Sequence, residues 1–164
     1  MSKRETAIFG AGCFWGVQYY FDQVPGVIET EVGYIGGRTD NPSYWDVASK
    51  KTGHAEAIKI TFDPSKVNYH TLLKHFFRMH DPTQLNRDGP NIGPEYRSAI
   101  FYADAGQKKA AEEMINMYNK YRTDAQVVTT VEKAETFWPA EEEHQNFTKK
   151  TGIGACHIDY APIN

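Results

Sequence analysis

A cysteine at a glycine-rich turn is the first feature of this chain that could do chemistry. Cys13 lies in GAGCFWG, residues 10–16, between glycines and directly before Phe14 and Trp15. We expect a strand, a turn and then a helix here, which places the thiol at a helix N-terminus. Unpaired N–H groups and the helix dipole stabilise a thiolate there and lower the cysteine pKa. The alternative is a small, inert core thiol.

An acid on the apolar face of a predicted strand is the second such feature. In TGHAEAIKITFD, residues 52–63, alternation places Glu56 on the same face as Ile58 and Ile60. A carboxylate on a core face is costly to ionise, so its pKa should rise, and a neutral acid can donate a proton near pH 7. The alternative is a strand end that lies in solvent or pairs with a basic residue.

The residues around the thiol leave more than one class of chemistry open. Phe14 and Trp15 are either core residues or the aromatic wall of a pocket, which would suit an apolar ligand carrying sulfur or a methyl group. A cysteine hydrolase needs a histidine base beside the thiol, and His54 is available for that role only by its position in the sequence. The six histidines show no ligand spacing, so we expect no metal and no other cofactor.

Composition excludes several classes of protein. The chain has 164 residues, is 40% hydrophobic and has a net charge of −3, which indicates one globular domain over 1–164 and no nucleic-acid footprint. No apolar run is long enough to span a membrane, and we recognise no signal peptide, so we expect a cytoplasmic protein. With only two cysteines, Cys13 and Cys156, a redox-active pair is favoured over a structural disulfide.

The hydrophobic pattern predicts alternating strands and helices. Strands are expected at 5–10, 27–35, 55–62, 98–102 and 127–132. Helices are expected at 13–23, 41–50, 69–80, 105–121 and 139–150, with a long loop over 81–95 and an irregular tail after 151. This order predicts an α+β fold, a two-layer sandwich with helices on one face of a mixed sheet and a ferredoxin-like core.

Several motifs together carry a resemblance that covers nearly the whole chain. They are GCFWG (12–16), NPSY (41–44), TGHAEA (52–57), HDPTQLNR (80–87), YRSAIFY (96–102) and FWPAEEEHQ (137–145). At these separations the chain resembles the A-class peptide methionine sulfoxide reductases, which act on the S epimer of the sulfoxide.

The resemblance implies a mechanism for the thiol and the acid. Cys13 matches the nucleophile that attacks the sulfoxide sulfur, and Glu56 matches the acid that protonates the sulfoxide oxygen. Tyr44 and Tyr96 match the tyrosines that hydrogen-bond this oxygen. Methionine then leaves, and Cys13 remains as a sulfenic acid, which a second thiol can attack.

The resemblance also implies how the substrate is held and how the enzyme is recycled. Phe14 and Trp15 match the wall that packs the substrate methyl group. Cys156 lies where some members carry a resolving cysteine in a mobile tail, here about 151–164. A Cys13–Cys156 disulfide would then be reduced by thioredoxin. The alternative is that Cys156 is merely buried.

Three positions depart from the pattern of the family. Asn91 stands where an acid thought to bind the substrate is common; an amide still hydrogen-bonds, so Asn91 is a candidate substrate-binding residue. Glu95 replaces a glutamine and could take over part of the role of the missing acid. Glu143 stands where a tyrosine is common.

Two other functions remain as alternatives. A thiol peroxidase or disulfide exchanger would keep its activity when Glu56 is lost. A non-catalytic module that binds methionine-rich partners through aromatic residues would keep its function in Cys13→Ser. The combination of acid, thiol and motifs favours the reductase.

Overall fold

The computed structural model describes residues 3–122, 124–153 and 160–163. The first half of the chain contains β1 (Glu5–Ala11), α1 (Phe14–Phe21), β2 (Val27–Ile35), α2 (Tyr44–Ala48), β3 (Ala55–Phe62) and α3 (Tyr69–Met79). The second half contains β4 (Arg87–Asp88), β5 (Asn91–Ile92), the 3₁₀ helix η1 (Pro94–Tyr96), β6 (Ser98–Tyr102), α4 (Ala105–Tyr121), β7 (Thr130–Lys133), β8 (Trp138–Pro139), the 3₁₀ helix η2 (Glu142–His144) and α5 (Phe147–Thr151).

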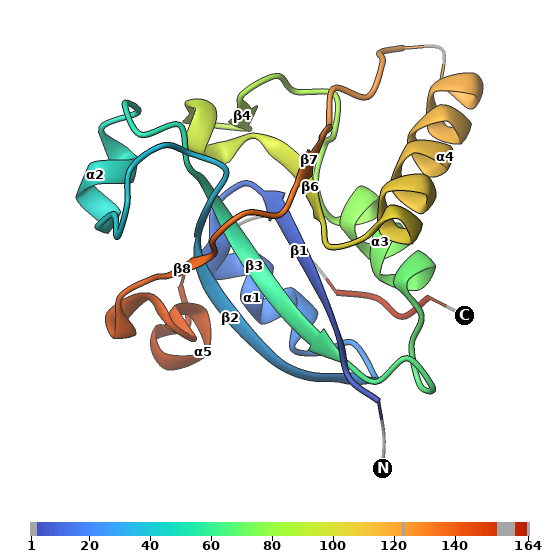
Figure 1. The fold of residues 1–164 in the computed structure, drawn as a ribbon, viewed down its shortest axis with the longest axis horizontal. Coiled ribbons are helices and arrows are strands. Elements are labelled where there is room, and N and C mark those ends of the chain that lie inside the picture. Colours follow the sequence, from blue (N-terminus) through green and yellow to red (C-terminus); the bar gives the residue numbers. More distant parts are fainter. Residues whose placement is uncertain (1–2, 123, 154–159, 164) are drawn as a thin grey trace.

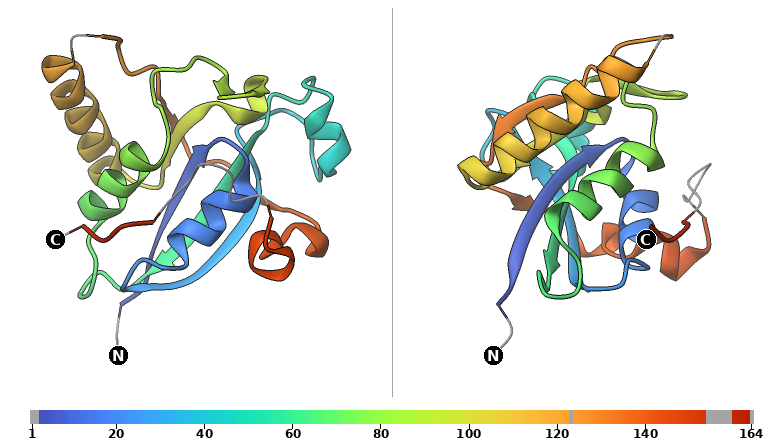
Figure 2. Two further views of the ribbon diagram at one scale, coloured as in Figure 1. Left: turned by 180° about the vertical axis from the view of Figure 1, so that it is seen from behind. Right: turned by 90° about the vertical axis from the view of Figure 1, so that its right-hand side faces the viewer.

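A six-stranded sheet in the order β7-β6-β1-β3-β2-β8 forms one layer. Its neighbouring strands are antiparallel except β6 and β7, which run parallel, so the sheet is mixed as predicted. The central order β6-β1-β3-β2, with α1 and α3 as connections, is the ferredoxin-like arrangement. Figures 1 and 2 show α1 and α3 on the same face of this sheet, with α4 beside α3. The α+β prediction is confirmed.

Alternation along β1 and β3 decides which side chains face the helices. The ring of Phe9 on β1 lies 4.9 Å from that of Phe76 on α3 and 5.9 Å from that of Phe21 on α1. Ile58 on β3 belongs to the same buried cluster. Glu56 lies two residues before Ile58 and therefore faces the helical layer too. The fold thus places a carboxyl group beneath α1.

The predicted helix over 139–150 is wrong. Trp138 and Pro139 instead pair with β2, and Pro139 lies opposite Gly33. Asn146 then has a left-handed backbone with φ of 57°, which separates η2 from α5. A proline followed by acidic residues suits a helix N-terminus, but here tertiary contacts with β2 override that local preference.

The predicted loop over 81–95 is partly regular. Its second half forms the β4–β5 hairpin, in which Asp88 pairs with Asn91, and then η1. η1 packs against β3 and so brings Tyr96 close to the strand that carries Glu56. The strand predicted from 127 begins at Thr130.

The described part of the chain contains no helix that is both long and apolar enough to cross a membrane. Half of the tail expected over 151–164 falls on residues 154–159 and 164, which lie outside the described ranges. Where the chain is described again, the ring of Tyr160 lies 5.3 Å from that of Tyr20 on α1. Ala161 accepts a hydrogen bond from Arg78 on α3, so this segment lies against the helical face.

Candidate active site

Cys13 occupies the N-cap position of α1, as the sequence predicts. Its side chain is half-buried where β1 has just ended. The preceding Gly12 has φ of 93°, in the region that favours glycine. A Cβ on Gly12 would also lie only 2.2 Å from Oδ2 of Asp88. The turn before the thiol therefore requires glycine both for its backbone and for its close contact with the β4–β5 hairpin.

Glu56 is almost completely buried directly below this turn. Only 2% of its surface is exposed, and its Oε1 accepts a 3.2 Å hydrogen bond from the backbone N–H of Phe14. Burial raises the pKa of Glu56 to about 8, although the Phe14 N–H acts in the opposite direction. The charge of Glu95 raises this pKa further, and Lys50 lowers it. The carboxyl group is therefore mostly protonated at pH 7, and the alternative of an exposed strand end is wrong.

Tyr44 and Tyr96 reach the same region from two different elements. Tyr44 is the first residue of α2, whose N-terminus is fixed by a capping box between Ser43 and Asp46. Tyr96 ends η1, just before β6. Burial is the main cause that raises the pKa of both hydroxyl groups, and the charge of Glu56 adds to it. Both hydroxyl groups therefore remain protonated and available as donors near neutral pH.

The thiol, the acid and these tyrosines form one electrostatically coupled cluster. Charge on Cys13 also raises the pKa of Tyr44 and Tyr96, and the two tyrosines influence the pKa of each other. Glu56 is bonded to the residue directly after Cys13. The fold thus brings together four residues that the sequence placed far apart. The cluster can present a sulfur nucleophile, a proton donor and hydroxyl donors to one bound group.

The aromatic residues beside the thiol have different surroundings. Trp15 is half-buried, and its ring lies 3.9 Å from that of Phe147. Its Nε1 donates a 3.0 Å hydrogen bond to Nδ1 of His144, which itself stacks on Tyr44 with ring centres 4.4 Å apart. Phe14 is only 1% exposed and packs behind this group. Trp15 therefore offers more open aromatic surface to a ligand than Phe14 does.

Glu141 and Gln145 support this site and were missed by the sequence analysis. Oε1 of Glu141 accepts a hydrogen bond from the hydroxyl of Tyr34, and Oε2 accepts one from the backbone N–H of Tyr44, each of 2.9 Å. Gln145 bonds both backbone groups of Val32, with distances of 3.0 and 2.9 Å. These contacts join the segment after β8 to β2 and α2. The sequence around these two residues, a proline followed by acidic residues, predicted the start of a helix and not a contact with the site.

Other residues considered in the sequence have separate outcomes. Asn91 lies on β5, and its side chain has no hydrogen bond among the described residues, so its role in substrate binding stays a prediction. Nδ1 of His54 accepts a 3.0 Å hydrogen bond from Gly37, and its Nε2 lies 2.6 Å from the carbonyl oxygen of Thr39. Both ring nitrogens are thus engaged away from the thiol, which argues against a hydrolase. Cys156 lies outside the described residues.

One group of possible metal ligands occurs within the described ranges. Glu141, Glu143 and His144 can bring ligand atoms within 4.8 Å of one another. However, both oxygens of Glu141 accept protein hydrogen bonds, and Nδ1 of His144 accepts one from Trp15. Glu143 is exposed. Most of the atoms that could bind a cation therefore already accept hydrogen bonds from the protein, and these bonds stabilise the aromatic side of the site.

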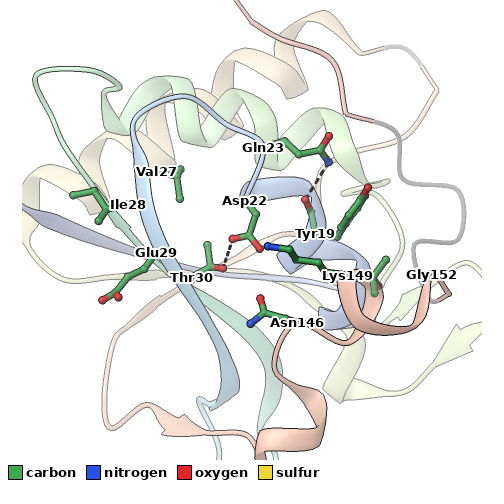
Figure 3. Close-up of a pocket in the computed structure, with 11 residues that line it drawn as sticks. Tyr19, Asp22, Gln23, Val27, Ile28, Glu29, Thr30, Asn146, Lys149 and Gly152 are labelled. Carbon is green, nitrogen blue, oxygen red and sulfur yellow. Dashed lines mark hydrogen bonds between the residues drawn. The ribbon is translucent and has the colours of Figure 1, made fainter.

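A cavity of about 880 Å³ lies apart from this cluster, between the end of α1, β2 and α5. Figure 3 shows Asp22 in it, bonded to Thr30, with the side chain of Lys149 directed toward the same carboxylate. Burial raises the pKa of Asp22. None of the described residues proposed for catalysis lines this cavity, so its size alone does not make it the reaction site.

The sequence matches one family over nearly its whole length. The family described as peptide methionine sulfoxide reductase matches residues 5–164. Peptide methionine sulfoxide reductase MsrA from Geobacter sulfurreducens is 50% identical over 156 residues, which cover 94% of this chain and 96% of that protein. The protein of the same name from Methanothermobacter thermautotrophicus is 47% identical, with 96% and 94% covered.

Solved structures agree with this match. Methionine sulfoxide reductase A of Corynebacterium diphtheriae has a TM-score of 0.88 and 33% identity, and covers 94% of this chain and 78% of its own. Mxr1 from Saccharomyces cerevisiae in reduced form has a TM-score of 0.87 and 29% identity, with 98% and 93% covered. Mxr1 in complex with Trx2 is 20% identical with a TM-score of 0.61, covers 88% and 85%, and shares the fold.

Proposed function

This chain belongs to the peptide methionine sulfoxide reductase family, and from that premise we propose that it reduces the S epimer of methionine sulfoxide, free or in proteins, to methionine. The observation that carries the proposal is the buried carboxyl of Glu56, bonded to the residue next to Cys13 at the start of α1, where burial raises its pKa to about 8. Sulfoxide oxygen is a poor leaving group until it is protonated, and Glu56 supplies that proton near neutral pH. The activity repairs oxidised methionine.

The first half of the reaction oxidises Cys13. Its thiolate attacks the sulfoxide sulfur while the proton of Glu56 passes to the sulfoxide oxygen. The sulfur–oxygen bond of the substrate breaks, and the hydroxyl group is transferred to the cysteine sulfur. The sulfur–sulfur bond formed by the attack breaks in the same step, and its electron pair returns to the methionine sulfur. Methionine sulfoxide gains two electrons and leaves as methionine, and Cys13 loses two electrons and becomes a sulfenic acid. Glu56 then takes a proton from solvent before the next cycle.

The remaining side chains orient the substrate for this step. Tyr44 and Tyr96 stay protonated and donate hydrogen bonds to the sulfoxide oxygen, where negative charge develops before proton transfer. Trp15, with Phe14 behind it, receives the methyl group, because sulfur and methyl groups pack well on aromatic rings. Only one arrangement of methyl, oxygen and side chain at sulfur satisfies these contacts, which gives preference for one epimer. Asn91 is a further proposed contact to the substrate.

The second half of the reaction restores the thiol. We assign Cys156 as the resolving cysteine: its thiol attacks the sulfenic sulfur of Cys13, forming a disulfide and releasing water. Thioredoxin then reduces this disulfide by thiol–disulfide exchange. The complex of Mxr1 with Trx2 supports this choice of reductant. We place the cycle in one catalytic domain in the cytoplasm, where thioredoxin keeps thiols reduced.

The pH dependence of Glu56→Gln tests the proposed acid. With separated S epimer and dithiothreitol, wild type should lose activity as pH rises through about 8, where Glu56 ionises. Glu56→Gln keeps an oxygen to accept the Phe14 N–H but cannot donate a carboxyl proton, so its kcat/KM at pH 7 should fall about 100-fold or more. Exposed Glu142→Gln is the control. An unchanged rate in Glu56→Gln would remove the acid role and favour the thiol peroxidase alternative.

A further inference from the structure

An ion pair between a half-exposed lysine and a buried glutamate lies beside Tyr96. Nζ of Lys50 and Oε2 of Glu95 are 3.0 Å apart, and the Glu95 side chain is only 1% exposed. The same ammonium group lies 5.8 Å from the centre of the Tyr96 ring. Oε1 of Glu95 has no hydrogen-bond partner among the described residues. A buried carboxylate with only one hydrogen-bonded oxygen lowers the stability of the folded state. Its presence next to the cluster of Cys13, Glu56, Tyr44 and Tyr96 therefore calls for a functional reason.

The backbone around the pair is also unusual. Lys50 has φ of 69°, a left-handed conformation that residues other than glycine seldom adopt. Gly93 has φ of 145°, and a Cβ there would lie 2.1 Å from Oε1 of Glu95 and 2.7 Å from Nζ of Lys50. The pair therefore packs directly over the backbone of Gly93. Such conformations occur preferentially at functional sites.

The pair lies on elements that neighbour the strand of Glu56. Glu95 belongs to η1, which packs against β3, the strand that carries Glu56. After burial and the Phe14 N–H, the charges of Glu95 and Lys50 are the next influences on the pKa of Glu56, and their signs are opposite. Glu95 raises that pKa and Lys50 lowers it.

We propose that Lys50 and Glu95 form a positioning pair that balances the charge next to Glu56 and so sets the pH range in which Glu56 donates its proton. The inference rests on the proposed function, because proton donation is the step that it adjusts. Neither residue touches the reacting atoms in this account. Lys50 makes Glu56 a stronger acid, Glu95 makes it a weaker one, and the native pair keeps these effects close to balance.

Other titratable groups also lie near Glu56, and substitutions of Lys50 or Glu95 leave them in place. From the elements packed around it, these groups are Cys13, Tyr34, Tyr44, Asp88 and Tyr96. Burial raises the pKa of the three tyrosines, so they are neutral over the range in which Glu56 titrates. Differences between variants therefore report the charges of Lys50 and Glu95.

The test is a comparison of Lys50→Met, Glu95→Gln and the double variant. The ¹³C NMR titration of the Glu56 carboxyl, assigned with Glu56→Gln, should move to lower pH in Glu95→Gln and to higher pH in Lys50→Met, each by about half a pH unit or more. The double variant should titrate near wild type. The alkaline limb of kcat/KM for the S epimer should shift in the same directions.

Matched controls come from an exposed ion pair on α4. Lys108 and Glu112 lie 4.0 Å apart with both side chains about half-exposed, and Lys108→Met and Glu112→Gln should leave the Glu56 titration unchanged. If Lys50→Met does not fold, the shift in Glu95→Gln and its reversal in the double variant still decide the question. Shifts that are absent, or that share one direction in both single variants, overturn the proposal. An inactive wild type with these NMR shifts would refute the proposed function alone.

Discussion

Glu56 shows how burial changes what a common side chain can do. A glutamate on an exposed strand end would be ionised at pH 7 and could not donate a proton. Here burial raises its pKa to about 8, so at pH 7 most molecules hold the proton that the proposed reaction transfers to the sulfoxide oxygen. Alternation with Ile58 predicted the buried face correctly. The same alternation could not predict that Lys50 and Glu95 lie near Glu56, because these two residues belong to other segments of the chain.

The same raised pKa has a cost for stability that can be measured. Between the unfolded pKa of 4.5 and the folded value of about 8, the folded state keeps a proton that the unfolded state releases. The free energy of unfolding therefore falls as pH rises through this range, by on the order of 3 kcal/mol for this one group. Glu56→Gln should lose that part of the pH dependence. The free energy of unfolding of Glu56→Gln minus that of wild type should therefore be larger at pH 8 than at pH 5. Urea unfolding at both pH values checks this, and identical pH dependence in both proteins would contradict it.

At the scale of elements, the site depends on contacts between segments that are distant in the chain. α1 supplies the thiol, β3 the acid, and α2 and η1 the hydroxyl groups. The segment after β8 holds α2 in place through Glu141, which accepts hydrogen bonds from Tyr34 and Tyr44. Burial alone would raise the pKa of Glu141, but the hydrogen bond from the Tyr44 N–H and other polar contacts lower it overall. Glu141 is thus a charged anchor for the element that carries Tyr44.

Removing this anchor should weaken both the fold and catalysis. Glu141→Ala deletes two hydrogen bonds to a charged group and leaves Tyr34 without its acceptor, so the free energy of unfolding should fall by about 2 kcal/mol. Because Tyr44 would no longer be held against β2, kcat/KM for the S epimer should fall roughly 10-fold. Glu142→Ala, at a neighbouring side chain that is 91% exposed, is the control. Equal stability and activity in the two variants would show that Glu141 does not hold α2.

The sequence was informative where local periodicity and tertiary structure agree. The strand–turn–helix around Cys13 and the amphipathic helix α3 were predicted within a few residues of their bounds. The helix predicted over 139–150 failed because pairing of Trp138 and Pro139 with β2 is a long-range contact that no local pattern contains. Glu141 and Gln145 were missed for the same reason.

At the scale of the whole molecule, the ferredoxin-like order explains how the site is assembled. Because β1 and β3 are neighbours in the sheet, the end of β1 with its thiol turn meets the start of β3 with its acid. The β4–β5 hairpin contacts the thiol turn through Asp88 at Gly12, and η1, which carries Tyr96, packs against β3. The topology, rather than sequence proximity, therefore creates the reactive cluster.

The proposed recycling also belongs to this scale, because the proposed disulfide would link Cys13 and Cys156, which lie near opposite ends of the sequence. Cys156→Ser should retain near wild-type turnover with dithiothreitol, which reduces the sulfenic acid of Cys13 directly. With thioredoxin it should complete about one turnover and then slow, because no disulfide forms for thioredoxin to reduce. Wild type should turn over continuously with either reductant. Thioredoxin-driven rates that match in the two proteins would remove Cys156 from the cycle.

The most direct test of the central claim is the reduction of separated S and R epimers of methionine sulfoxide by wild type and Cys13→Ser. Each protein is supplied with dithiothreitol, so the result does not depend on Cys156 or on a protein reductant. We expect wild type to convert the S epimer to methionine and to leave the R epimer unchanged, and we expect Cys13→Ser to reduce neither epimer. Turnover of the R epimer, turnover that survives in Cys13→Ser, or no reduction of either epimer by folded wild type would contradict this claim.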